Sequence, residues 1–318
     1  MSFVLKTEDE YEDLLGLWSD LEAGLSMLLL HPQNAREFPA RILQYDRWMQ
    51  NLIQHDTDVA LYLLFQLASH SPVGYSASHA LVCAVLCHLV AREIQLPETE
   101  RDSLVRAALT MNIAMTGLQN QLANQRGRPT PEQEVALQTH EARGEDLLRT
   151  LGIDDALWLQ TVLQHHQETS LREDLLRLPA PLRLTHILNV VDRYAAMISP
   201  RQSRAGRSAT ESAKSILTSN SAQNNQVAQT LMQVVGLFPP GTFVQLDNAT
   251  VGVVMRRRNQ DKHPDIAIVL NDKGQLMRPP SLHSSYNGSP AITAALPASG
   301  VQEHLNHHLI LQLGARPG

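Results

Sequence analysis

The stretch SHALVCAVLCHLVA, residues 78–91, says most about the fold of this chain. At the 3.6-residue period of an α-helix, His79 shares a face with Val82 and Cys83. His88 lies nine positions after His79, about half a turn away, so we expect one of the two histidines to face inward. The apolar run is well short of the ~20 residues that cross a bilayer, and we expect no transmembrane helix.

Length and composition limit the class of protein. The 318 residues are 43% hydrophobic and 18% charged, which is enough for a sizeable core and about two domains. Lys and Arg number 26 against 32 Asp and Glu, so a nucleic-acid partner is disfavoured. Cys83 and Cys87, the two cysteines, are expected to be buried thiols in a reducing compartment. The first residues lack a signal-peptide pattern, and we expect a cytoplasmic protein without a membrane anchor.

Hydrophobic periodicity predicts a mainly α fold that ends in a small antiparallel β element. The predicted segments are an N-terminal helical region (1–70), a helical domain (71–237), a three-stranded β extension (238–278) and a flexible tail with a short helix (279–318). Thr130, Pro131 and Gln133 have the spacing of a capping box at a helix start. The tetrapeptide NDKG, residues 271–274, predicts a turn.

Several of the fourteen histidines have positions that favour a common site. His166 continues the apolar helical stripe of Leu159 and Val162, and His165 lies beside it. Asp192 is expected at the edge of a buried helical face, where a charge needs a partner. One inward histidine alone is most often a hydrogen-bonded core residue. Imidazoles and a carboxylate from separate helices together are typical ligands of a transition metal.

The order of these motifs resembles the HD-GYP family of cyclic di-GMP phosphodiesterases, a branch of the HD metal-dependent phosphohydrolases. The matching stretches are SHALVCAVLCHLVA with His79, AALTMNIAM (107–115), PTPEQEVALQTHEARG (129–144) with His140, His165-His166-Gln167, VVDRYAAMISPRQSR (190–204) with Asp192, Arg201 and Arg204, and FPPGTFVQL (238–246). They span more than half of the chain. The resemblance implies an HD-domain-like helical bundle with an N-terminal helical extension.

The resemblance also implies roles for particular residues. It gives His79, His140, His165, His166 and Asp192 as metal ligands. It places Arg201, with Arg204 nearby, where a ligand phosphate is bound, and guanidinium groups suit phosphate oxygens. The alternative for the two arginines is a solvated basic loop at a helix end.

Departures from the family pattern fall on its catalytic residues. The His-Asp doublet of the family is Met111-Asn112 here, its lysine falls at Met115, and a glutamate of some members falls at Tyr75. The G-Y-P loop is replaced by QETSLREDLLRLPAP, residues 167–181. The family's aspartate bridges two cations, whereas Asn112 offers a neutral carbonyl and Met111 a soft thioether. We therefore expect no two-metal centre.

These observations predict a divergent HD-GYP-type signalling protein without catalysis. The remaining ligands hold either one divalent ion (iron, manganese or zinc) or none. The expected partners are a cyclic dinucleotide, a signalling protein such as a diguanylate cyclase or a response regulator, or a second copy of the chain. The alternative function is a phosphohydrolase with a mononuclear metal site. A third hypothesis is that the site has no role and that residues 1–70 act through protein contacts.

Overall fold

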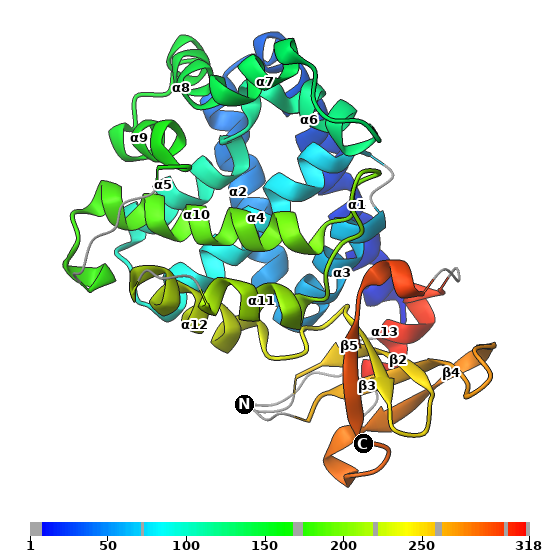
Figure 1. Ribbon diagram of the computed structural model, residues 1–318. Helices are drawn as coiled ribbons and strands as arrows, with labels where there is room; N and C mark the ends of the chain where they lie inside the picture. The colour runs from blue at the N-terminus through cyan, green and yellow to red at the C-terminus, as the bar shows by residue number, and fades with distance from the viewer. Residues whose placement is uncertain are drawn as a thin grey trace.

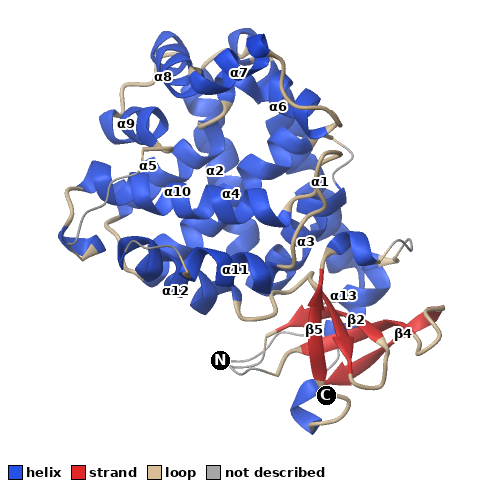
Figure 2. Cartoon of the chain, viewed as in Figure 1, coloured by secondary structure: helices blue, strands red, loops and turns tan. Residues whose placement is uncertain are grey.

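The computed structural model describes residues 8–70, 73–167, 174–218, 222–257, 263–301 and 305–315. Figure 1 and Figure 2 show a body of helices with a small sheet at one end, close to the C-terminal helix. The predicted mainly α fold with a C-terminal antiparallel β element is confirmed.

The helical body is made of segments that follow one another over short connections. In chain order its helices are α1 (Glu8–Leu30), α2 (Phe38–His55), α3 (Thr57–His70), α4 (Tyr75–Glu93), α5 (Glu98–Thr110), α6 (Thr116–Ala123), α7 (Pro131–Gln138), α8 (His140–Thr150), α9 (Ala156–Gln164), α10 (Ala180–Ile198), α11 (Ala209–Leu217) and α12 (Ala222–Val235), and α13 (His307–Ala315) follows the sheet. A single 3₁₀ turn, η2 (Ile113–Met115), joins α5 to α6.

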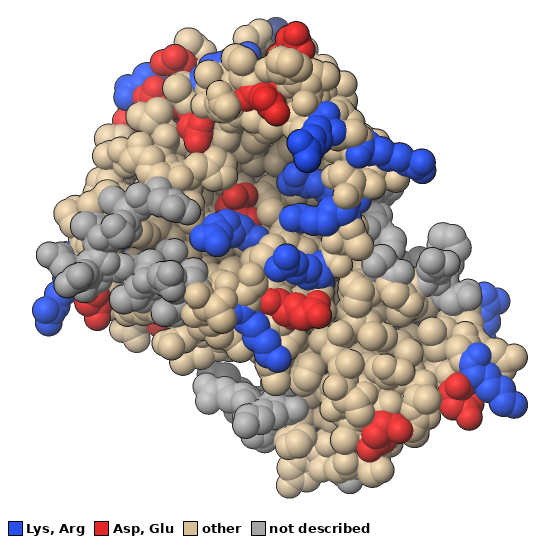
Figure 3. Space-filling model, viewed as in Figure 1, with Lys and Arg blue, Asp and Glu red and all other residues tan. Residues whose placement is uncertain are grey.

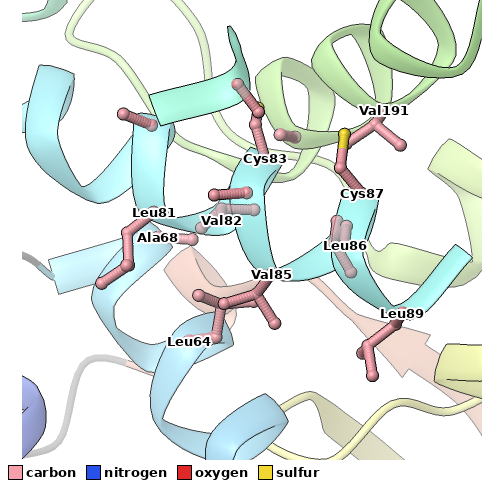
Figure 4. Packing of buried hydrophobic residues seen from close by; sticks show 14 of the residues in the cluster. Leu64, Ala68, Leu81, Val82, Cys83, Val85, Leu86, Cys87, Leu89 and Val191 are labelled. Atoms are coloured by element: carbon pink, nitrogen blue, oxygen red, sulfur yellow. The ribbon is translucent and has the colours of Figure 1, made fainter. Parts of the chain in front are cut away.

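Helix α4, which contains residues 78–91, is the centre of the body. It is buried from Ser76 to Ala91 and packs against α1, α2, α3, α5, α6, α10 and α12. Figure 4 shows Leu81 and Val85 of α4 facing Leu64 and Ala68 of α3. Burying a side chain of the size of leucine stabilises a fold by about 1.5–3 kcal/mol, so the continuous apolar surface of α4 explains its central place.

Among the described helices, α4 alone has the length and hydropathy of a membrane span. Within the fold, 89% of the apolar segment of this helix is buried. Its apolar surface is therefore covered by the neighbouring helices, as expected of a core helix.

The β element has more strands than predicted. Its sheet is antiparallel, with the order β4-β3-β2-β1-β5, and is made of β1 (Phe243–Leu246), β2 (Val251–Arg256), β3 (Asp265–Leu270), β4 (Leu276–Ser284) and β5 (Ile292–Leu296). The prediction of three strands was wrong by two. The two strands that were not predicted are β4 and β5. Their sequences are rich in Pro, Ser and Ala, which lowers the strand signal, but β4 pairs with β3 and β5 pairs with β1, and this pairing satisfies their backbone groups.

Local signals in the sequence identified two features correctly. Thr130 and Gln133 form a reciprocal capping box at the start of α7. The amide of Gly274 donates to the carbonyl of Asn271 at 3.0 Å, which closes the predicted turn. The short helix expected in the tail is α13, which begins at His307. The division of the chain into four segments stays a prediction.

The sheet is attached to α3 through backbone contact and ion pairs. Gly241 has a φ of +86°, and a Cβ there would lie 2.4 Å from the carbonyl oxygen of Tyr62, so only glycine fits. The side-chain amide of Gln66 donates to the carbonyl of Gly241 at 2.6 Å. Arg257, after β2, pairs with Asp58 at the start of α3, with 2.6 Å between Nε and Oδ1.

Candidate functional site

The five expected metal ligands lie in two neighbouring groups. One consists of His140, His165 and His166, and in the other His79 and Asp192 are joined by Cys83, which was not expected. Within each group the ligand atoms all lie within 4.8 Å of one another. Asp192 and the imidazoles of the first group influence one another's ionisation, so the two groups are electrostatically connected. We call these six residues together the histidine cluster.

The three-imidazole group comes from α8 and the end of α9. His140 is the first residue of α8, and His165 and His166 directly follow α9. The ring centroids of His165 and His166 are 4.2 Å apart, and that of His140 lies 5.1 Å and 5.2 Å from them. Asn189 of α10 donates to the carbonyl of His165 at 2.9 Å and holds this chain segment in place.

Backbone carbonyls fix the orientation of two of these rings. The Nδ1 of His140 lies 2.6 Å from the carbonyl oxygen of Leu137, and the Nδ1 of His165 lies 2.7 Å from that of Val162. A carbonyl oxygen only accepts, so each Nδ1 carries the proton and each Nε2 presents a lone pair. The two Nε2 atoms are 3.3 Å apart. A cation or a proton shared by the two Nε2 atoms would relieve the repulsion between their lone pairs. Metal-binding histidines usually donate their other ring N–H to a carbonyl or carboxylate in this way.

A proton is disfavoured at this place near neutral pH. Burial, and then the charge of the neighbouring His166, lower the pKa of His165 to about 3. Burial also lowers the pKa of His140. The rings of His140 and His165 are therefore neutral ligands over the physiological range.

The second group joins α4 to α10. The Nε2 of His79 lies 2.8 Å from Oδ1 of Asp192 and 3.7 Å from the Sγ of Cys83. Burial opposes ionisation of Asp192, but the hydrogen bond from His79 and the charges of the imidazoles lower its pKa to about 2. Burial, and then the negative charge of Asp192, raise the pKa of the Cys83 thiol. Asp192 therefore has the partner that its burial requires.

Two expectations about which histidine faces inward were wrong. His165 is fully buried and His166 is exposed, because the chain leaves helix α9 after Gln164 and the helical stripe no longer sets their direction. His79 and His88 are both buried, 2% and 1% exposed, because α4 is covered on all sides. Both ring nitrogens of His88 lack a hydrogen-bond partner within the described part of the chain.

The substituted doublet lies at the join of α5 and η2. Met111 is fully buried, and Met115 is 8% exposed. Asn112 precedes η2, which packs against α8, the helix that starts with His140. Its Oδ1 is buried and has no partner among the described residues. An uncharged acceptor thus stands where the resemblance places a metal-bridging anion.

Tyr75 connects Arg201 to the histidine cluster. The NH2 of Arg201 donates to the Tyr75 hydroxyl at 2.8 Å, and its guanidinium carbon lies 4.7 Å from the centre of the Tyr75 ring. The Tyr75 ring stacks on His79 with 5.4 Å between centroids and 13° between planes. The Nε of Arg201 is buried and has no partner in the described ranges, so the guanidinium keeps a donor for a ligand.

The two expected phosphate-binding arginines differ in their surroundings. Arg201 and Arg204 form a short backbone bridge, and the amide of Gln202 donates to the carbonyl of Ala123 at 2.8 Å, which ties the loop to α6. Arg204 is exposed and donates to the carbonyl of Ala196. Figure 3 shows Lys and Arg side chains gathered around a hollow at the place that the loop after α10 occupies in Figure 1.

Sequence reasoning missed two members of the site, Tyr75 and Cys83. Tyr75 was noted as a substituted position only, and Cys83 as a buried thiol. The signal was available, because both lie four residues from His79 and i, i+4 neighbours share a helical face. The stretch that replaces the G-Y-P loop includes residues 168–173, which lie outside the described residues.

Comparison with known proteins gives one informative match. No family model matches the sequence. The chain is 27% identical over 212 residues to a Pseudomonas aeruginosa protein named cyclic di-GMP phosphodiesterase PA4108. This chain is similar to a cyclic di-GMP phosphodiesterase. The alignment covers 63% of the chain and 49% of the relative, so the chain spans about half the length of that protein. The similarity supports the resemblance that the motifs indicated.

Proposed function

We propose that this chain is a divergent HD-GYP-type signalling domain that binds a cyclic dinucleotide without hydrolysing it. The relative's name supports the class of ligand. The neutral side chain of Asn112 is the observation that supports the loss of hydrolysis. In-line displacement at phosphorus is promoted by two ions that stabilise the attacking and leaving oxygens, and two adjacent cations need an anion between them. A neutral amide does not supply that charge.

The proposal accommodates one divalent ion. The donors of the histidine cluster fit it, since His140 and His165 direct lone pairs toward one another and Asp192 supplies a carboxylate. Zinc, iron and manganese all accept imidazole and carboxylate ligands. When bound, such an ion would supply positive charge to a phosphate. The lost lysine position, Met115, is apolar and supplies none.

Arg201 is the residue that we propose for phosphate recognition. Its guanidinium is held by Tyr75, and its Nε still lacks a partner among the described residues. Hydrogen bonds from arginine to phosphate are charge-assisted and directional. The exposed Arg204 lies on the same short loop and adds positive charge near Arg201.

Calorimetry and a product assay on the same preparation test this function. The protein, supplied with iron or manganese, is titrated with cyclic di-GMP, and the linear dinucleotide is then measured. We expect binding without product. Arg201→Ala should weaken binding by about 10-fold to 100-fold, because a charged hydrogen bond contributes about 1.5–3 kcal/mol.

Arg207→Ala is the matched control, since Arg207 is an exposed arginine of the same loop whose side chain contacts Met197 and Ser215. It should bind as the unmodified chain does. Absence of binding, or turnover that His165→Ala abolishes, would show the proposal to be wrong.

One observation favours a second function, a mononuclear metallohydrolase. The ligand atoms of His140, His165 and His166 lie close together, and three imidazoles with an open position are a known arrangement for an ion that acidifies a bound water. This function predicts stoichiometric metal in the purified protein, loss of that metal in His140→Ala, and hydrolysis of a phosphoester by the loaded protein. Its failure would be metal-loaded protein without phosphoesterase activity.

A further inference from the structure

Cys83 belongs to a donor group whose chemistry differs from that of the three imidazoles. It lies one helical turn after His79 on α4, and Asp192 reaches the same place from α10. All three are at most 9% exposed. Figure 4 shows Cys83 and Cys87 on the side of α4 that faces α10, with Cys87 beside Val191.

The geometry of the group suits an ion with tetrahedral coordination. Bonds of ~2.1 Å to nitrogen and ~2.3 Å to sulfur separate the two ligand atoms by about 3.6 Å around such an ion. The observed distance from His79 Nε2 to Cys83 Sγ is 3.7 Å. The 2.8 Å from the same nitrogen to Asp192 is that of the hydrogen bond which an ion would replace.

Charge distinguishes this group from its neighbour. A thiolate and a carboxylate together neutralise a divalent cation, whereas His140, His165 and His166 carry no negative charge when neutral. Asn112 is neutral where the resemblance places an aspartate, and the thiolate of Cys83 is able to supply the missing negative charge. Thiolate, imidazole and carboxylate together are ligands typical of zinc and a poor match to manganese or magnesium.

The ring of His79 is positioned for such a role. Tyr75 stacks against it, and its Nδ1 is buried without a partner in the described part of the chain. Neither nitrogen is tied to a backbone carbonyl among the contacts that the structure describes, so Nε2 is free to exchange the hydrogen bond for a metal bond.

We infer that His79, Cys83 and Asp192 form a zinc site in which the Cys83 thiolate replaces the charge lost at Asn112. This inference rests on the proposed function, because it assigns the single ion of a non-hydrolysing site to a particular set of ligands. Two anionic ligands reduce the charge that the ion presents to a water in its fourth position, so the water is acidified less than on three imidazoles.

Zinc content and a cobalt spectrum test the inference. The purified chain is loaded with zinc, desalted and measured by elemental analysis, and a second sample is loaded with cobalt. We expect about one tightly bound zinc and a near-ultraviolet thiolate-to-cobalt charge-transfer band. Cys83→Ala should lose both, and Cys83→Ser provides a second variant that preserves side-chain volume.

Cys87→Ala is the matched control, since Cys87 is an equally buried thiol one turn further along α4 and outside the donor group. It should retain the zinc and the band. Zinc that survives in a folded Cys83 variant and is lost in His165→Ala would assign the ion to the imidazoles and overturn the inference. A chain that binds no zinc would also overturn it. Cyclic di-GMP turnover, measured separately, would instead contradict the proposed function.

Discussion

At the scale of single residues, His88 shows what burial does to a titratable group in this fold. It is 1% exposed, and burial, assisted by the charges of Arg101 and Arg92, lowers its pKa to about 4. The ordinary value is about 6.5. As the pH falls between these values, the unfolded chain takes up a proton that the folded chain does not. The free energy of unfolding therefore decreases with decreasing pH.

His88→Gln should reduce this acid sensitivity. One group of this kind contributes up to ~1.4 kcal/mol per pH unit to the slope of stability against pH between about 4 and 6.5. Urea unfolding at several pH values should show a shallower slope in the variant, with the remainder due to groups such as His165. His31→Gln, at an exposed position, serves as control. An unchanged slope in His88→Gln would contradict this account.

Most residues of the histidine cluster could be identified from the sequence, because their order resembles that of a known family. Their division into two groups could not. It depends on how far α8 and α9 lie from the start of α4, and this distance follows from packing rather than from spacing along the chain. The inclusion of Cys83 required the distance between its sulfur and His79, which the i, i+4 spacing only suggests.

At the scale of elements, the ion pairs at the start of α3 hold the sheet to the helical body. Asp58 accepts from the backbone amide of Arg257 at 3.1 Å and from its Nε at 2.6 Å. The two side chains are 15% and 25% exposed, so water screens the pair only in part. Such a pair matters most when one partner is removed, because the other charge remains half-buried.

Asp58→Asn should lower the free energy of unfolding by about 1–3 kcal/mol, the cost of leaving a buried polar group without its partner. Glu98→Gln is the control, because Glu98 is 81% exposed and lies 3.8 Å from Arg101, and exposed pairs contribute less than ~1 kcal/mol. Chemical denaturation of both variants gives the comparison. Equal losses of free energy of unfolding in the two variants would contradict a stabilising role of the Asp58–Arg257 pair.

Helices were easier to predict than strands in this chain. The apolar run of α4 and the capping box of α7 are local signals, and both lie on helices in the structure. Strands β4 and β5 contain prolines or many small residues and acquire their structure from pairing with β3 and β1. The partner of β5 lies far earlier in the chain and leaves little trace in local composition, whereas Pro279 and Pro280 weaken the strand signal of β4.

At the scale of the whole molecule, α4 links the parts of the fold. Its apolar sides are covered by the N-terminal helices and by α5, α10 and α12, while its first turns carry Tyr75, His79 and Cys83. The core of the body is thus also the support of the site. Asn112 lies outside α4, so under the proposed function a neutral side chain at this position leaves the support of the site intact.

In the proposed function, the neutral side chain of Asn112 prevents the assembly of two adjacent ions. Crystals of the full chain grown with manganese and cyclic di-GMP, measured at a wavelength where manganese scatters anomalously, test it most directly. We expect at most one manganese peak in the histidine cluster and an uncleaved dinucleotide. Two peaks about 3.5–4 Å apart beside Asn112, the separation of two-metal centres, would contradict it.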